Sequence, residues 1–301
     1  MERTDRRMGW KAILVSVPVL VVLTLPLGAF GARTSDSQLK ADIETLASDS
    51  MQGRDNATPG STLAQAYLIS QLKLFARGAN SGASGDDAFK QTIPGGTNIV
   101  AIIPGTAPPN EYVIVGAHYD HLAFCFSADF NDDICNGATD NATGVANVLA
   151  IGRAIATQRR APRRSVILAF WDQEEDGLLG SNYYVQHPLV PLGSTVAYVN
   201  YDIQGAILLP KLRRSTFAIA SETGGPQFAR TVRRAVTGVG LRTRFVSSIF
   251  GQYRSDYVNF IDAQIPTVFF SDSTGPCYHT AQDETDVVDF TKLSRGCPVR
   301  C

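Results

Sequence analysis

Six short apolar segments constrain most strongly what this chain can fold into. They are rich in Val, Ile and Phe and do not alternate with polar residues, as in strands that are buried on both faces. Segments with helical periodicity lie between them. This alternation predicts an α/β domain with a central, mostly parallel mixed sheet flanked by helices. The apolar segments span residues 98–103, 112–117, 166–171, 197–201, 216–220 and 267–270, and the helical ones 144–158, 177–187, 227–238 and 255–261.

The first part of the chain is predicted to be helical. Apolar residues recur at helical spacing across residues 35–76, and a polar turn at 53–60 interrupts them. No internal repeat and no second composition regime follow. With 44% hydrophobic and 18% charged residues, the 301-residue chain can build an ordinary globular core. We therefore expect a single folded domain over residues 33–301.

The amino-terminal residues have the order of a targeting segment. A basic region precedes an apolar stretch from residue 12 to about residue 32, which small residues close. This order predicts a secretory signal peptide over residues 1–32. The alternative is an uncleaved membrane anchor, because the stretch approaches the roughly 20 residues that span a bilayer. Membrane attachment is expected only in that case, and both interpretations give a secreted or periplasmic location.

The charge balance argues against one class of partner. The formal net charge is −1, from 27 basic and 28 acidic side chains, and no long basic run follows the first dozen residues. Binding to nucleic acid requires a basic face that neutralises phosphates. We therefore expect no nucleic-acid partner.

The five cysteines lie in two groups. Cys125 and Cys135 enclose a short polar loop, and Cys277, Cys297 and Cys301 lie near the carboxyl end. None has the CxxC spacing of a structural zinc site, whereas disulfides are common in exported proteins. We predict a disulfide between Cys125 and Cys135. The other three cysteines leave one odd thiol, which the sequence does not identify.

Four of the apolar segments lead into residues that commonly bind metals. Ligand sites in open α/β sheets form at the carboxyl ends of the strands, so neighbouring parallel strands would bring these residues to one edge. A fifth contribution comes from the Gly- and Asn-rich segment 136–144, which is unsuited to a strand and opens a helix. The side chains are His118 and Asp120, Glu174 and Glu175, Asp202, His279, and Asp140 in the fifth segment.

The distribution of histidines sharpens this prediction. The chain has only four, and His118, His121 and His279 lie within or beside these acidic segments. A single histidine is usually a hydrogen-bonded structural residue, but the combination of imidazoles and carboxylates is hard to obtain by chance. Such ligands without thiolates favour zinc, and less often cobalt or manganese.

The adjacent Glu174 and Glu175 have two interpretations. They can form a solvated helix start, where the helix dipole favours acidic residues. They also follow a buried segment directly and precede Gly177, which favours an active-site role. In that role, one carboxylate binds a metal and its neighbour acts as the base toward water.

Taken together, these motifs resemble those of zinc-dependent exopeptidases with two co-catalytic metals. That family includes secreted bacterial aminopeptidases, glutaminyl cyclases and glutamate carboxypeptidases. The similarity covers about residues 40–290, and the motifs occur in the family's order, which is more specific than any one of them alone. The matching stretches are 46–54 with 58–60, 116–120, 137–144, 174–181, 201–202, 255–256 and 279–283.

The resemblance implies a site for two zinc ions per chain. His118 and Asp202 look like the ligands of one ion. Glu175 and His279 look like the ligands of the other, and Asp140 would bind both.

It also implies roles for residues beside the ligands. Glu174 would be the general base and acid, and Asp120 would orient the ligating imidazole of His118. Asp283 would support the loop of the last ligand in a similar way. Tyr253 lies near a position where some relatives have a tyrosine that stabilises the transition state, but its spacing to the following motif differs.

The expected activity is the hydrolysis of residues from the amino terminus of peptides that have a free amino group. The nearest rival is a glutaminyl cyclase, which uses one zinc ion. The intact pair His118 and Asp202 favours a second metal and therefore hydrolysis. A carboxypeptidase-like enzyme on the same scaffold is another alternative. A non-catalytic binding module is the last, although such relatives lose ligands and this chain retains every expected one.

Overall fold

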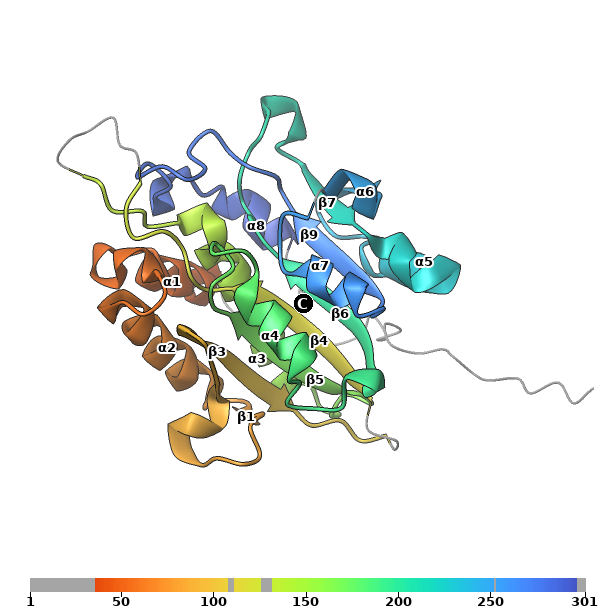
Figure 1. The fold of residues 1–301 in the computed structure, drawn as a ribbon. Helices are drawn as coiled ribbons and strands as arrows, with labels where there is room; N and C mark the ends of the chain where they lie inside the picture. Colours follow the sequence, from red (N-terminus) through yellow and green to blue (C-terminus); the bar gives the residue numbers. More distant parts are fainter. Residues whose placement is uncertain (1–35, 108–110, 126–131, 252, 297–301) are drawn as a thin grey trace, which may run out of the picture.

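The computed structural model describes residues 36–107, 111–125, 132–251 and 253–296. The predicted signal segment 1–32 lies outside these ranges. The strands form one sheet in the order β1-β3-β5-β4-β6-β9-β7-β8, with β2 paired to β3 (Figure 1). They are β1 (Arg77–Gly78), β2 (Lys90–Ile93), β3 (Gly96–Ile103), β4 (Tyr112–His118), β5 (Ser165–Trp171), β6 (Thr195–Tyr201), β7 (Ser215–Ile219), β8 (Arg242–Val246) and β9 (Thr267–Ser271).

The centre of the sheet is parallel. Strands β5, β4, β6 and β9 run in the same direction, and β7 is parallel to β8. The flanking pairs β1–β3, β2–β3, β3–β5 and β7–β9 are antiparallel. The carboxyl ends of the four central strands therefore lie at one edge. The predicted mostly parallel mixed sheet is confirmed.

Helices connect most of these strands. The short helical turns are η1 (Asp49–Arg54), η2 (Gly85–Phe89), η3 (Ala138–Ala142), η4 (Leu192–Ser194), η5 (Pro210–Leu212), η6 (Ser221–Gly224) and η7 (Thr285–Val287). The α-helices are α1 (Asp36–Leu46), α2 (Pro59–Leu72), α3 (Thr143–Ala156), α4 (Leu179–Gln186), α5 (Gly225–Ala235), α6 (Ser248–Gly251), α7 (Tyr257–Asp262) and α8 (Phe290–Gly296).

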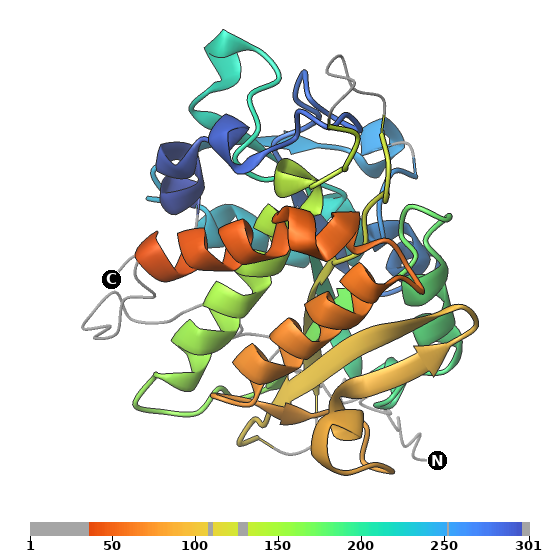
Figure 2. The same cartoon turned by 90° about the vertical axis from the view of Figure 1, so that its left-hand side faces the viewer.

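The helices cover both faces of the sheet. Helices α1, α2, α3 and α8 contribute to the core on one face, and Figure 2 shows α1, α2 and α3 there. Helices α4 and α7 pack on the other face (Figure 1). Strand β5 is buried along its whole length and contributes side chains to the hydrophobic cores on both faces of the sheet. Leu168 and Phe170 pack on the first face, and Ile167 and Trp171 on the second.

The predicted disulfide is present. Cys125 and Cys135 are bonded, with Cα atoms 5.4 Å apart. Cys277 has no disulfide partner among the described residues, while Cys297 and Cys301 lie outside them. Within the described ranges, no helix is both long and apolar enough to cross a membrane.

Candidate metal centre

The predicted metal ligands converge at the carboxyl edge of the central strands. His118 is the last residue of β4, and Asp202 follows β6 directly. Glu175 lies in the turn after β5, and His279 lies in the loop after β9. Asp140 lies in η3, which leads into α3. The sheet therefore gathers residues that are far apart in the sequence.

The ligand atoms form two groups that share one residue. His118, Asp140 and Asp202 make up the first group. Asp140 belongs also to the second group, with His121, Glu175 and His279. Within each group all ligand atoms lie within 4.8 Å of one another. The five ligands that the family resemblance implies are thus all in the cluster, and His121 is an addition.

The two carboxylate oxygens of Asp140 face different groups. Oδ1 lies 3.3 Å from Nε2 of His118, which is also 3.3 Å from Oδ1 of Asp202. Oδ2 lies 3.2 Å from Nε2 of His279, which is also 3.2 Å from Oε2 of Glu175. A carboxylate with its oxygens directed in this way can bind two cations at once.

Asp120 contacts both halves of the site. The Nδ1 atom of His118 lies 3.0 Å from the backbone oxygen of Asp120 and 3.6 Å from its carboxylate Oδ1. The other carboxylate oxygen, Oδ2, accepts a hydrogen bond of 3.2 Å from the backbone N–H of Glu175. Asp120 therefore holds the imidazole mainly through its main chain, and its side chain fixes the turn that carries Glu175.

The segment that carries Asp140 is held by Asp283. The Asp283 carboxylate accepts hydrogen bonds from the backbone N–H groups of Thr139 and Asp140 and from the Thr139 hydroxyl, at 2.7 to 3.2 Å. The peptide bond between Asp140 and Asn141 is cis. Asp283 was predicted to support the loop of His279; its backbone N–H does donate to the backbone oxygen of Thr280 in that loop, but its carboxylate holds the Asp140 segment.

A close approach between α3 and β6 fixes the other end of this segment. A Cβ atom on Gly144 would lie 2.6 Å from the backbone oxygen of Tyr201 and 2.1 Å from Oδ1 of Asn141. The same Oδ1 atom accepts hydrogen bonds from the N–H groups of Gly144 and Ile203. Glycine at 144 therefore allows Asn141 to join the start of α3 to the end of β6.

Arg54 is a buried residue that sequence analysis did not single out. Its guanidinium donates to the backbone oxygens of Leu46, Tyr119, Asn136 and Gly137 at 2.6 to 3.1 Å. Burial lowers its pKa to about 10, against the attraction of nearby carboxylates, so Arg54 stays charged at neutral pH. It ties η1 to the segments that carry the ligands. Arg54 is the last residue of the matching stretch 46–54, but only the converging chain segments reveal this role.

Glu174 and Glu175 are adjacent but electrostatically different. Burial raises the pKa of Glu174 well above its usual value, and the charge of Asp202 adds to this. Burial also acts on Glu175, but contacts with His121 and His279 outweigh it and lower the pKa to about 2. Carboxyl groups whose pKa values are pushed apart are typical of an acid–base residue beside a ligand.

The structure favours a different tyrosine from the one considered in the sequence. Tyr253 is 76% exposed. Tyr278 stacks on the ring of His279, with centroids 3.8 Å apart. Burial and the charges of the site carboxylates, Asp140 first, raise the pKa of Tyr278. Its place directly before a predicted ligand was the one signal in the sequence that could have identified it.

Protons balance the carboxylates when no cation is present. Burial alone would lower the pKa of His279, but its contacts with Asp140 and Glu175 raise it to about 10. Burial alone would also lower the pKa of His118. The charges of Glu174 and Asp202 outweigh this effect and raise the pKa of His118 well above its usual value. His279 therefore carries a proton at neutral pH, and the surroundings of both imidazoles favour a positive charge, which a metal cation can supply instead.

The donor set fits zinc. Although it lies near two carboxylates, Nε2 of His279 has no hydrogen bond of suitable geometry, and it is buried. A buried polar atom needs a partner. A zinc ion held by imidazole and carboxylate atoms provides one. Among the described residues, the ion pairs of Asp140, Glu175 and Asp202 are all with histidines, so no Lys or Arg side chain occupies the place of a cation.

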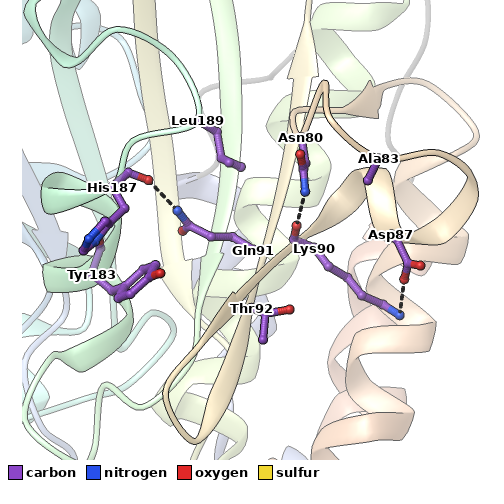
Figure 3. Close-up of a pocket in the computed structure, with 9 residues that line it drawn as sticks. All are labelled: Asn80, Ala83, Asp87, Lys90, Gln91, Thr92, Tyr183, His187 and Leu189. Carbon is purple, nitrogen blue, oxygen red and sulfur yellow. Dashed lines mark hydrogen bonds and ion pairs between the residues drawn. The ribbon is translucent and has the colours of Figure 1, made fainter.

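A separate pocket of about 380 Å³ lies away from this edge, between β2 and the end of α4 (Figure 3). Several of its polar groups have partners within the protein. Gln91 donates to the backbone oxygen of His187 at 2.7 Å, and Lys90 pairs with Asp87 at 3.0 Å. The ring of Tyr183 stacks on that of His187. None of the predicted site residues lines this pocket.

Comparisons with curated proteins extend the structural result. The chain is 32% identical over 210 residues to "Probable glutamate carboxypeptidase LAMP1" of Arabidopsis thaliana, covering 66% of this chain and 28% of that protein. It is 29% identical over 221 residues to "Aminopeptidase NAALADL1" of Mus musculus, and this alignment covers 64% of this chain and 28% of that protein. The chain thus spans less than a third of the length of these relatives.

Solved structures share the fold. The LapA aminopeptidase of Legionella pneumophila aligns with this chain with a TM-score of 0.67 and 17% sequence identity. The alignment covers 93% of this chain and 78% of the LapA chain. A glutaminyl cyclase of Bacteroides thetaiotaomicron aligns with a TM-score of 0.68 and 20% sequence identity. That alignment covers 89% of this chain and 96% of the cyclase chain.

Residues 98–296 of this chain match the family model described as "Peptidase family M28". The match includes β4, β5, β6 and β9, whose carboxyl ends carry the candidate ligands, and the η3 segment with Asp140. Because it also covers well over half of the sequence, the chain belongs to Peptidase family M28.

Proposed function

We propose that the protein is an exported two-zinc aminopeptidase, which removes residues from the amino terminus of peptides. The observation that carries the proposal is the shared position of Asp140, whose two oxygens face two separate groups of ligand atoms. His118 and Asp202 would complete one zinc position with it. Glu175 and His279 would complete the other.

When bound, zinc would supply the positive charge that lowers the pKa of a water molecule, stabilises the oxyanion of the scissile carbonyl and binds a substrate amino group. The chain's own side chains do the rest. Glu174 takes a proton from the attacking water and returns it to the leaving amine. Its raised pKa supports this role, because a carboxylate with a raised pKa is a stronger base toward water and can return the proton to the leaving amine.

Hydrolysis rather than cyclisation is supported by the intact first ligand group. A cyclase that uses one zinc ion needs only the group of Asp140, Glu175 and His279, whereas His118 and Asp202 are here buried, 3.3 Å apart and aligned with Asp140. Cleavage at the amino terminus is supported by the similarity to an aminopeptidase of Mus musculus. The expected partners are peptides with a free amino terminus.

Glutamate carboxypeptidase-like activity is the second candidate, because "Probable glutamate carboxypeptidase LAMP1" has 32% identity to this chain. Such an enzyme would hold a substrate carboxylate with basic side chains near the metals. Arg54 is a basic residue whose hydrogen bonds reach the segments that carry the ligands, and its donors are taken by backbone oxygens. We therefore favour the aminopeptidase.

Export is supported by two observations. The basic and apolar order of residues 1–32 is that of a signal peptide. The disulfide between Cys125 and Cys135 is typical of proteins from oxidising compartments.

Product identification tests the proposal. Purified enzyme is incubated with an unblocked peptide of mixed sequence, with and without a zinc chelator, and the products are followed by mass spectrometry. We expect stepwise loss of residues from the amino end, which the chelator abolishes and added zinc restores. Release from the carboxyl end, loss of ammonia from an amino-terminal glutamine, or an unchanged peptide would each contradict the proposal.

A further inference from the structure

The histidine His121 contacts a metal ligand but has no part in the proposed function. Its side chain is completely buried, and its Nδ1 atom lies 2.6 Å from Oε1 of Glu175. Because an ionised carboxylate only accepts hydrogen bonds, Nδ1 carries the proton and donates it. This distance is short for an N–H···O hydrogen bond, as expected when the acceptor is charged.

The two oxygens of Glu175 consequently have different partners. Oε1 accepts the hydrogen bond from His121. Oε2 lies 3.2 Å from Nε2 of His279, on the side of the ligand group that includes Asp140. Since one oxygen is engaged by His121, the other is the oxygen directed to the metal position.

The surrounding residues fix the ring of His121 by packing. A Cβ atom on Gly137 would lie 2.5 Å from Cδ2 of the ring, so glycine leaves the space that the ring fills. A ring nitrogen and the bonded sulfur atoms of Cys125 and Cys135 lie within 4.8 Å of one another. The Nε2 atom has no hydrogen-bond partner in the described part of the chain. The hydrogen bond to Glu175 is therefore the directed polar contact of this ring.

We propose that His121 is a positioning residue of the metal centre, which holds Oε1 of Glu175 so that Oε2 alone faces the zinc position formed with Asp140 and His279. The consequence is tighter zinc binding at that position, because hydrogen bonds that orient a ligand reduce the freedom lost when the metal binds. The inference rests on the proposed function only in assuming zinc at this position. It assigns His121 no role at the position of His118 and Asp202.

The test measures zinc affinity at one position at a time. Asp202→Ala leaves the ligands of the Glu175 position intact, and Glu175→Ala leaves those of the other. In each background, His121→Leu removes the donor with little change of volume, whereas His121→Asn retains a nitrogen donor close to the place of Nδ1. Zinc affinity is measured by competition with a chromophoric chelator, and circular dichroism checks that each metal-free variant is folded.

In the Asp202→Ala background we expect His121→Leu to weaken zinc binding by about 10- to 100-fold and His121→Asn to restore most of the loss. In the Glu175→Ala background neither substitution should change the affinity. An unchanged affinity for His121→Leu in the first background would overturn the proposal. If His121→Leu and His121→Asn lost zinc affinity equally, His121 would be a direct ligand. If the loss of zinc affinity were equal in both backgrounds, the role of His121 would be merely structural. Both results contradict the proposal.

The proposed function is tested separately by the unmodified enzyme. Fewer than two bound zinc ions, or products other than amino-terminal residues, would refute that function. The effect of His121 at the Glu175 position can be measured in either event.

Discussion

At the scale of the residue, the site depends on how neighbouring side chains divide the work. Asp140 directs one oxygen to each ligand group, and Glu174 and Glu175 differ in pKa although they are adjacent. Burial affects both glutamates, but only Glu175 has imidazoles in contact that stabilise its charge. One residue is therefore suited to bind a cation and the other to transfer a proton.

Replacing Glu174 with Gln should separate these roles. Glutamine has the shape of the acid but cannot take a proton, so we expect kcat to fall by about 10²- to 10⁴-fold while the zinc content stays that of the wild type. Zinc is counted by elemental analysis and kcat is measured on an amino-acid anilide. Glu175→Gln is the matched control, which should lose zinc. More than about a tenth of the wild-type rate in Glu174→Gln would show that another group transfers the proton.

Zinc binding to the metal-free protein should depend on pH. The pKa of His279 is raised to about 10, so this imidazole carries a proton at pH 7, and the pKa of His118 is raised in the same direction. Ligation requires neutral imidazole, so zinc must displace such protons. The apparent affinity should therefore rise with pH between pH 6 and 9, by up to about tenfold per unit for each proton displaced.

Calorimetric titrations in buffers of different ionisation enthalpy measure the number of protons released. A pH-independent affinity with no proton release would show that the imidazoles are neutral before zinc arrives.

The residues that sequence analysis found and missed differ in kind. His118, Asp202 and the two glutamates lie at the ends of apolar strands or within about four residues of them, so their positions alone predict their convergence. His121 lies as close to the end of its strand, but its role was not predictable because it depends on a contact with Glu175 in another loop. Arg54 acts on backbone oxygens of segments up to 83 positions away, and no side-chain pattern encodes such contacts.

At the scale of the element, parallel strands and the segments between them bring the ligands together. The six apolar segments all became strands, since burial on both faces requires continuous apolar residues. Strand β8 was missed because its first three residues are polar and because the strand is largely half-exposed at the sheet edge, so it has no continuous apolar run. Strand β1 has two residues, which is too short for any periodicity. The predicted helices differ from α3, α4, α5 and α7 only near their ends.

Removing the carboxylate of Asp283 should loosen η3. In Asp283→Ala the buried N–H groups of Thr139 and Asp140 lose their acceptor, so we expect the free energy of unfolding to fall by about 2–4 kcal/mol. Zinc affinity should fall at both positions, because both use Asp140. Asp286→Ala is the control, since Asp286 is exposed and nearby. Chemical denaturation measures the difference, and equal stability of the two variants would contradict this role of Asp283.

At the scale of the whole molecule, one sheet brings all the candidate ligands together. The ligands come from four strand ends and from η3, and helices on both faces bury the strands that carry them. This arrangement follows from the order of apolar and helical segments, which is why the fold was predictable from the sequence. Substrate choice was not predictable in the same way, because relatives with this fold are named as aminopeptidases, carboxypeptidases and glutaminyl cyclases.

The most direct test of the aminopeptidase assignment compares one peptide with its amino-terminally acetylated form. Acetylation removes the lone pair of the amino group and adds bulk beyond the first residue. Each loss plausibly costs a few kcal/mol, and about 1.4 kcal/mol is already tenfold in rate. We therefore expect kcat/KM to fall at least about a hundredfold for the acetylated peptide. Equal cleavage of both peptides, or cuts within a long chain, would contradict the assignment while leaving the metal centre itself intact.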